Sequence, residues 1–310
     1  MSPFYVSSTR GAVKGGLLRL VAVIMRCLGI FFLIRNSLAR EKVTIVFYHN
    51  PDQKNFEKHL AYLSSRYCII SLDLLERALN QNNWDLIPAK SLIITIDDGY
   101  KENYDLLPVI QKYKIQPTIY LCSGIIGTNR HFWHTHIQKS RCEQLKKMSE
   151  QTRENFLRNE DGFEKEREYP GERQALSVEE IKKMAAVVDF GAHSLFHPIL
   201  TACSDQQSWE EISRSKSEVA LLSGGRCKHF AYPNGDYASR EVNFVKRAGY
   251  LTARSVEPGW NGPKSDLQRL KSFMVDDDAT LSLLAMQISG YKCLTHFFKK
   301  WVSLKGCQSA

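Results

Sequence analysis

Short apolar runs alternate with stretches of helical spacing along most of this chain, from Val43 onward. The apolar runs are rich in β-branched and aromatic residues and predict strands at residues 43–49, 92–97, 117–122, 187–193, 228–233 and 250–254. Apolar residues three and four positions apart predict helices at residues 56–66, 71–81, 104–113, 177–186, 209–224, 239–249 and 279–290. The alternation amounts to roughly six or seven βα units. It predicts an α/β fold with a parallel sheet or barrel, whose chemistry lies at the carboxyl ends of the strands.

One long segment interrupts this alternation. Residues 128–176 are rich in charged residues, contain helical stretches and a Tyr-Pro-Gly-Glu turn at 169–172, and show no strand pattern. We therefore predict a helical insertion at 128–176 within a βα body that runs from residue 43 to residue 290.

The segment before the body is apolar and basic. Residues 16–34 are nearly all apolar but contain Arg19 and Arg26, which lie seven apart and so share one side of a helix. A central arginine makes this segment a marginal membrane span, and no small-residue cleavage site of a signal peptide follows it. We expect the helix in residues 12–40 to lie on a membrane surface with its arginines at anionic headgroups. An amphipathic helix packed on the domain is the alternative.

The end of the chain repeats this character more weakly. Residues 291–305 can form a helix with one apolar stripe flanked by lysines, which would pack either on a membrane or on the core. The expected organisation is a membrane-associating segment at 1–42, the body at 43–290, and a basic amphipathic helix at 291–310.

Charge is distributed unevenly, because the formal net charge of +9 belongs to the two ends. Residues 1–42 hold seven basic residues and one acidic residue, residues 291–310 hold four lysines and no acid, and the body carries a net charge of −1. A nucleic-acid groove in the body would need clustered Lys and Arg, so we expect no nucleic-acid partner. The eight cysteines are scattered without a CxxC pair, which favours free thiols in a reducing compartment.

Candidate chemistry follows two of the predicted strands. Asp97 and Asp98 end the apolar run 92–96, and His193 and His197 lie four residues apart where another strand ends. Two imidazoles and a carboxylate that converge with open positions form a facial site for a catalytic divalent metal. A cation would stabilise one carboxylate as its ligand and tolerate the second beside it. Either motif alone is often incidental, whereas both at strand ends of one α/β body favour a metal site.

Three motifs together resemble those of the polysaccharide deacetylases, the NodB-like group that forms family four of the carbohydrate esterases. TIDDG at 95–99 stands where that family has T-F-D-D-G, HSLFHP at 193–198 matches its H-S/T-x-x-H-P, and FAYPNGDY at 230–237 is similar to its third motif. The resemblance extends from about Val43 to Gly290, with the motifs in the family's order. It implies a distorted (β/α)7 barrel of the NodB-homology type, to which this chain adds the N-terminal helix and the insertion.

The resemblance also implies roles for individual residues. Asp97 would be the general base, and the backbone N–H of Asn234 would help to hold the oxyanion. One divalent metal ion, commonly zinc with cobalt, nickel or iron as alternatives, would be bound by Asp98, His193 and His197. Tyr232 and Pro233, within the third motif, would lie at the substrate.

The chain departs from the family pattern at several positions. Ala231 stands where many members carry an arginine that tunes the base, and no late Leu-x-His motif supplies the general acid. His49, at the end of the first strand, is a candidate for that acid or a structural histidine. Trp260 could line an acetyl pocket. Trp133 could stack on a sugar or simply pack, and it lies among three histidines expected at a substrate-facing edge: His131, His134 and His136.

These observations predict a metal-dependent N-deacetylase of an N-acetylated sugar or glycan. The basic, apolar ends and the cysteine pattern favour an enzyme on the cytoplasmic face of the inner membrane, acting on a polyprenyl-linked sugar during surface-polysaccharide biosynthesis. The alternatives are a deacetylase of finished polymer, such as peptidoglycan or exopolysaccharide, outside the membrane; a lipid-linked sugar deformylase; and an inactive carbohydrate-binding barrel.

Overall fold

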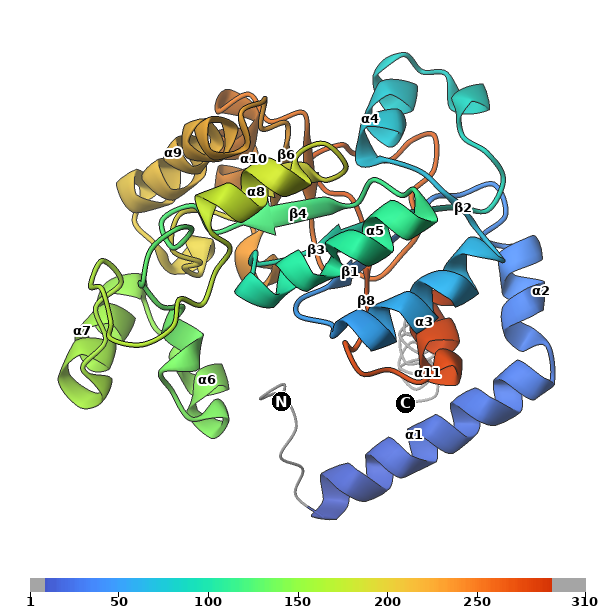
Figure 1. The fold of residues 1–310 in the computed structure, drawn as a ribbon, viewed down its shortest axis with the longest axis horizontal. Helices are drawn as coiled ribbons and strands as arrows, with labels where there is room; N and C mark the ends of the chain where they lie inside the picture. Colours follow the sequence, from blue (N-terminus) through green and yellow to red (C-terminus); the bar gives the residue numbers. More distant parts are fainter. Residues whose placement is uncertain (1–8, 292–310) are drawn as a thin grey trace, which may run out of the picture.

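A curled, all-parallel sheet forms the centre of the computed structural model, which describes residues 9–291 (Figure 1). Its strands are β1 (Thr44–Tyr48), β2 (Cys68–Ile69), β3 (Ser91–Ile96), β4 (Thr118–Leu121), β5 (Asp189–Ala192), β6 (His229–Ala231), β7 (Thr252–Arg254) and β8 (Phe273–Met274). The strand order is β7-β6-β5-β4-β3-β1-β8, and β2 pairs with the beginning of β3. All six predicted strands are present, while the two-residue strands β2 and β8 were not predicted because each is too short to show a period.

Helices surround this sheet. They are α1 (Thr9–Cys27), α2 (Ile30–Asn36), α3 (Gln53–Ser64), α4 (Leu72–Asn80), α5 (Leu107–Tyr113), α6 (Lys139–Leu145), α7 (Glu150–Asp161), α8 (Val178–Met184), α9 (Asp205–Ser223), α10 (Ser239–Arg247) and α11 (Leu281–Ile288). Short 3-10 turns are η1 (Trp84–Leu86), η2 (Lys101–Leu106), η3 (Trp133–Thr135), η4 (Leu200–Ala202) and η5 (Pro233–Gly235). Serine capping boxes at Ser177 and Ser204 begin α8 and α9, the first of them as its sequence predicts.

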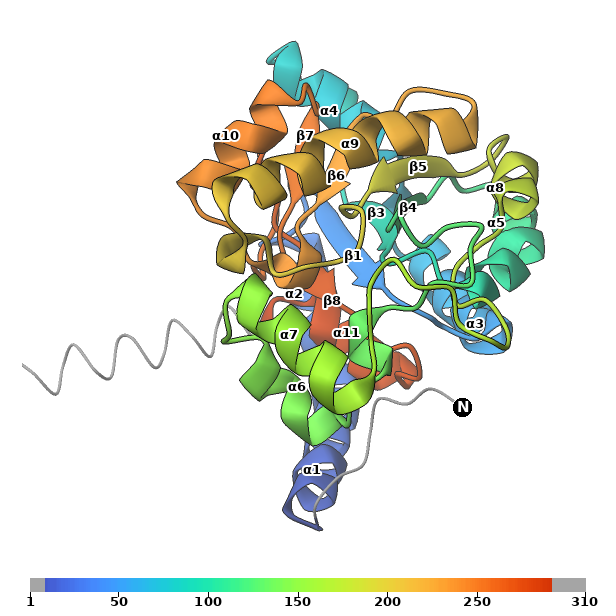
Figure 2. The same cartoon turned by 90° about the vertical axis from the view of Figure 1, so that its left-hand side faces the viewer.

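The predicted insertion contains η3, α6 and α7, and within residues 128–176 no strand is formed. Figure 2 shows α6 and α7 standing apart from α8 and α9, which cover the sheet. Their own small core holds Trp133, Leu145, Leu157 and Phe163.

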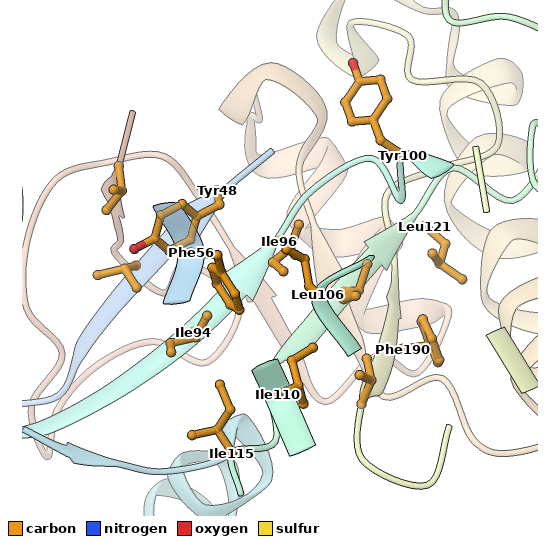
Figure 3. Packing of buried hydrophobic residues seen from close by; sticks show 14 of the residues in the cluster. Tyr48, Phe56, Ile94, Ile96, Tyr100, Leu106, Ile110, Ile115, Leu121 and Phe190 are labelled. Atoms are coloured by element: carbon orange, nitrogen blue, oxygen red, sulfur yellow. The ribbon is translucent and has the colours of Figure 1, made fainter. Parts of the chain in front are cut away.

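Alternation along β3 separates the two faces of the sheet. Leu92, Ile94 and Ile96 face outward into the layer of helices, where they meet residues of α3 and α5 such as Phe56 and Ile110 (Figure 3). Ile93 faces the barrel interior in a second cluster with Ile45, Tyr120, Ala231 and Leu270. The position that continues this inward row beyond Ile93 and Thr95 is Asp97.

The barrel remains open along one side. Among the described residues no ladder joins β7 to β8, and the chain between them contributes only isolated bridges, Arg254 with Leu270 and Asn261 with Val43. The fold is therefore a curled half-barrel of parallel strands, as expected for the distorted barrel class.

The apolar N-terminal segment forms two helices rather than one. Gly29, at a φ of 70°, breaks the segment between α1 and α2. Within residues 9–291 no single helix is both long and apolar enough to cross a membrane, although residues 15–27 and α2 together meet that criterion across a 65° bend. The basic helix predicted at 291–310 lies, apart from Tyr291, outside the described residues.

Gly191 in β5 allows the Tyr120 ring to lie against the strand inside the barrel. A Cβ at Gly191 would come within 2.6 Å of the Tyr120 ring and 2.8 Å of the His229 carbonyl oxygen. We expect Gly191→Ala to lower the free energy of unfolding by about 1–3 kcal/mol, because the fully buried ring cannot move aside. Denaturant unfolding measures this effect. Gly225→Ala, where a Cβ meets only the Ser223 hydroxyl at 3.9 Å, is the matched control and should change stability by less than about 0.5 kcal/mol.

Candidate metal and catalytic site

The carboxyl end of β3 presents two carboxylates with different surroundings. Asp97 extends the strand, since its N–H donates to the Tyr48 carbonyl at 2.9 Å, and its side chain points into the barrel. Asp98 adopts a left-handed φ of 72°, which turns its side chain away from that row. Both side chains are almost completely buried.

Asp97 is held by an arginine that lies across the barrel interior. The Nη2 atom of Arg254, the last residue of β7, is 2.5 Å from both carboxylate oxygens of Asp97. The guanidinium lies 4.4 Å from the Phe47 ring centroid and 5.4 Å from that of Tyr120. Burial by itself raises the pKa of Asp97, but Arg254, His193, His49 and the hydrogen bond to Arg254 together hold that pKa below its ordinary value, with Arg254 the largest of these contributions. Asp97 is therefore an ionised carboxylate in an apolar interior.

Arg254 takes the place of the arginine that the third motif lacks. Ala231 and Arg254 are register partners on β6 and β7, so their side chains face the same way. In this chain the arginine beside Asp97 comes from the neighbouring strand β7, so the third motif alone could not locate it.

Asp98, His193 and His197 bring three donor atoms to one point. The Asp98 Oδ1 atom lies 3.6 Å from His193 Nε2 and 3.5 Å from His197 Nε2. Ligand atoms about 2.0–2.2 Å from a tetrahedral metal are about 3.4 Å apart, so these spacings fit a divalent ion. Asp98 Oδ1 is buried and has no hydrogen-bond partner among the described residues.

The protonation of the two histidines supports the same conclusion. His193 Nδ1 lies 2.8 Å from the Ala231 carbonyl oxygen, which can only accept, so Nδ1 carries the proton and Nε2 presents a lone pair. Burial, followed by the neighbouring His193 and His134, lowers the pKa of His197 well below its ordinary value, which keeps that ring neutral. The two imidazole lone pairs and the carboxylate oxygen that they face repel one another unless a cation lies between them.

The loop that carries these histidines is strained and fastened from several sides. Ser194 and His197 have φ values of 66° and 57°. The His197 N–H donates to Ser194 Oγ at 3.0 Å, and Trp133 Nε1 donates to the His197 carbonyl at 2.9 Å. The buried Glu211 of α9 accepts the N–H groups of Leu195 and Phe196 at 2.8 and 3.0 Å.

His49 lies beside Asp97 at the mouth of the barrel. It follows β1, whose last residue Tyr48 is the register partner of Ile96, so His49 and Asp97 occupy adjacent strand ends. Its backbone N–H donates to Asp277 Oδ1 at 3.2 Å, and its carbonyl accepts from Asn103. His49 also contributes to lowering the pKa of Asp97, after the larger contributions of Arg254 and His193. The position suits a proton donor, whose assignment stays a prediction.

His134, one of the three histidines expected at a substrate-facing edge, reaches this site from the insertion. Its ring centroid lies 5.4 Å from that of His197, and its Nε2 is 2.9 Å from the Tyr100 hydroxyl. Burial lowers the pKa of His134 to about 4, so it is neutral. His131 and His136 instead bond to each other at 2.7 Å and stack near Tyr169.

The structure contradicts the predicted substrate contacts of two aromatic residues, Tyr232 and Trp260. Tyr232 is 1% exposed and donates its hydroxyl to the Gln268 carbonyl at 3.1 Å, because alternation along β6 turns it outward. Trp133 is 5% exposed beneath the Arg153 guanidinium, which agrees with the alternative that it simply packs. Trp260 contacts Lys42 and Phe273 at the amino end of β1, opposite the metal cluster, so it lines no acetyl pocket.

The third motif does bring its backbone to the strand ends. Pro233 is buried directly after β6, and Asn234 has a left-handed φ of 57°. Within the described residues the Asn234 N–H donates to no backbone carbonyl, so this donor is available to a substrate oxygen.

A second cluster at the amino ends of β5 and β6 has the same residue types but different chemistry. His229 Nε2 lies 2.9 Å from Asp73 Oδ1 and 3.3 Å from Asp189 Oδ2. Lys228 Nζ is 2.5 Å from the other Asp73 oxygen, and Thr252 Oγ1 is 2.8 Å from His229 Nδ1. Hydrogen bonds and a lysine already satisfy these groups, so we assign no metal there.

Comparison with known proteins agrees with this geometry. A family model described as polysaccharide deacetylase matches residues 87–253, more than half of the chain. YxkH of Bacillus subtilis (strain 168), which carries a provisional polysaccharide deacetylase assignment, is 24% identical over 229 residues. That alignment covers 70% of this chain and 66% of YxkH, slightly less than two thirds of its length.

Two solved structures share the fold. The Streptococcus pyogenes deacetylase PplD, solved in complex with acetate, has 19% identity and a TM-score of 0.59 over 80% of this chain and 98% of its own. IcaB from Ammonifex degensii has 17% identity and a TM-score of 0.58 over 81% of this chain and 96% of its own. These likenesses confirm the predicted NodB-type barrel.

The role of the ion pair between Asp97 and Arg254 can be tested by placing the arginine on β6 instead of β7. We expect Arg254→Ala to leave Asp97 buried and unpaired, lowering the free energy of unfolding by about 3–5 kcal/mol. Adding Ala231→Arg, on the registered neighbour, should recover part of that loss and part of the activity. Denaturant unfolding and initial rates measure both effects. A double variant as impaired as Arg254→Ala would show that the strand position of the arginine cannot be exchanged.

Glu211 predicts a pH dependence of stability. Burial raises its pKa from 4.5 to about 7, although the hydrogen bonds from the N–H groups of Phe196 and Leu195 lower it. The folded protein therefore keeps a proton that the unfolded chain releases in this pH range. Stability should therefore fall as the pH rises from 4.5 to 7, by up to about 3 kcal/mol. Glu211→Gln keeps an acceptor for both N–H groups and should abolish this loss. If urea unfolding shows the same pH dependence for both proteins, Glu211 does not cause it.

Proposed function

Because the chain belongs to the polysaccharide deacetylase family, carbohydrate esterases that act on N-acetyl amide bonds, we propose that it is a metal-dependent sugar N-deacetylase. One observation carries the proposal. An unpartnered, buried oxygen of Asp98 meets two imidazole lone pairs, while the adjacent Asp97 is ionised and held separately by Arg254. The predicted enzyme class is confirmed at the level of the family.

Each group in this arrangement has a distinct task. Asp98, His193 and His197 would hold the divalent ion, which when bound polarises an amide carbonyl and acidifies water. Asp97 accepts the proton of the attacking water, since Arg254 keeps its carboxylate ionised and fixed. The N–H of Asn234 donates to the oxygen that becomes negative in the tetrahedral state. His49, beside Asp97, gives the departing amine its proton.

For the substrate we propose an N-acetylated sugar on a polyprenyl carrier, met at the cytoplasmic face of a membrane. Its support is the basic charge and apolar character of residues 1–42, beside a body with a net charge of −1. Acetate, which was present in the PplD structure, is the acid that hydrolysis of an N-acetyl group releases.

Acetate release with and without a chelator tests the function. We expect acetate from N-acetylglucosamine oligomers or lipid-linked N-acetylhexosamine, and no release after chelation. Asp97→Asn should lower the rate by about 10³-fold and retain metal, because Asp97 is a base and not a ligand. His193→Ala should lose both metal and activity.

His131→Ala is the control, because His131 lies in the insertion and bonds to His136 rather than to the cluster. It should retain metal and rate. Equal loss of metal in Asp97→Asn and His193→Ala, measured by elemental analysis, would contradict the separate roles of the two aspartates. A chelator-resistant rate would contradict metal dependence.

A further inference from the structure

The first helix turns its apolar side toward solvent. Ten large apolar side chains between Leu17 and Leu38 are between 38% and 68% exposed, which is the reverse of an ordinary surface helix. We call this set the outer apolar face; its members are Leu17, Leu18, Leu20, Val21, Val23, Ile24, Leu28, Phe32, Leu33 and Leu38. Figures 1 and 2 both show α1 along the lower edge of the molecule, beyond the sheet.

The opposite side of α1 packs against the rest of the protein. Ala22 is fully buried and α1 packs along α11. The Arg26 guanidinium lies 5.4 Å from the Tyr62 ring centroid, and its Nη1 is 3.4 Å from Ser282 Oγ. Arg26 thus contacts the domain from this side of α1, while its side chain remains exposed at the edge of the helix. Arg19, seven residues earlier, lies on the same side of the helix.

The outer apolar face continues across the break at Gly29. Phe31 and Ile34 of α2 are buried, whereas Phe32 and Leu33 between them are 59% and 62% exposed. Both helices, which meet at a 65° bend, therefore carry exposed apolar side chains on one side and buried ones on the other.

We propose that the outer apolar face docks on the surface of an anionic phospholipid bilayer. An aliphatic helix face without polar partners fits the boundary between headgroups and acyl chains. The sequence around it is strongly basic, with seven Lys or Arg and one acid in residues 1–42, which complements anionic headgroups. The proposal does not depend on the catalytic one.

Vesicle flotation of the full-length protein tests this surface. We expect the wild type to float with phosphatidylcholine vesicles that contain phosphatidylglycerol and more weakly without it. Ile24→Ser with Leu28→Ser should reduce partitioning by about tenfold or more. The control pair, Leu221→Ser with Leu251→Ser, removes similar exposed aliphatic area elsewhere and should float like the wild type.

Three results would overturn the proposal. One is wild-type protein that stays with the unbound fraction on anionic vesicles. Another is flotation that survives Ile24→Ser with Leu28→Ser. The third is a change of oligomeric state in that variant without lipid, seen by light scattering, which would assign the face to a second copy of the chain. Equal melting temperatures of both variant pairs verify that the fold is intact.

Discussion

The ion pair between Asp97 and Arg254 is the interaction on which the rest of the site depends. It joins β7, at one edge of the open sheet, to β3 near its middle, through an interior otherwise lined by apolar residues such as Ile45 and Ile93. A lone carboxylate there would be neutralised by burial, and a lone guanidinium would be costly. Each charge offsets the cost of burying the other, so the pair keeps a base ionised and also ties the edge strand β7 to β3 across the interior of the open barrel.

Backbone strain is concentrated where side chains must converge. Asp98, Ser194, His197 and Asn234 all have positive φ without being glycine, and they follow three different strands. Their neighbours restrain them: Ser194 and Trp133 bind the backbone of His197, and Glu211 binds the loop between the histidines. A strand end that continued straight would send Asp98 away from the imidazoles, so the turn is what separates a ligand from a base one residue earlier.

Patterns among neighbouring residues predicted the strands and the residues at which they end. Strand alternation placed Asp97 and His193 at the same edge of the sheet, because parallel strands end together. Arg254 could not be found that way, since its partner Asp97 follows β3, four strands along the sheet from β7 and 157 positions away in the chain. His134 lies in an insertion without a strand register. Trp260 was misplaced because the irregular chain between β7 and β8 returns to the amino end of β1.

For the N-terminal helices, too, the sequence predicted only part of the arrangement. A hydrophobic segment with Arg19 and Arg26 on one side predicts amphipathicity but not which side faces the protein. Tyr62 and Ser282 accept the arginine side, and this leaves the larger apolar side outward. A globular domain that needed α1 only for packing would bury more of its leucines. Exposed leucines are stabilised by contact with an apolar phase, which is what the proposed bilayer surface provides.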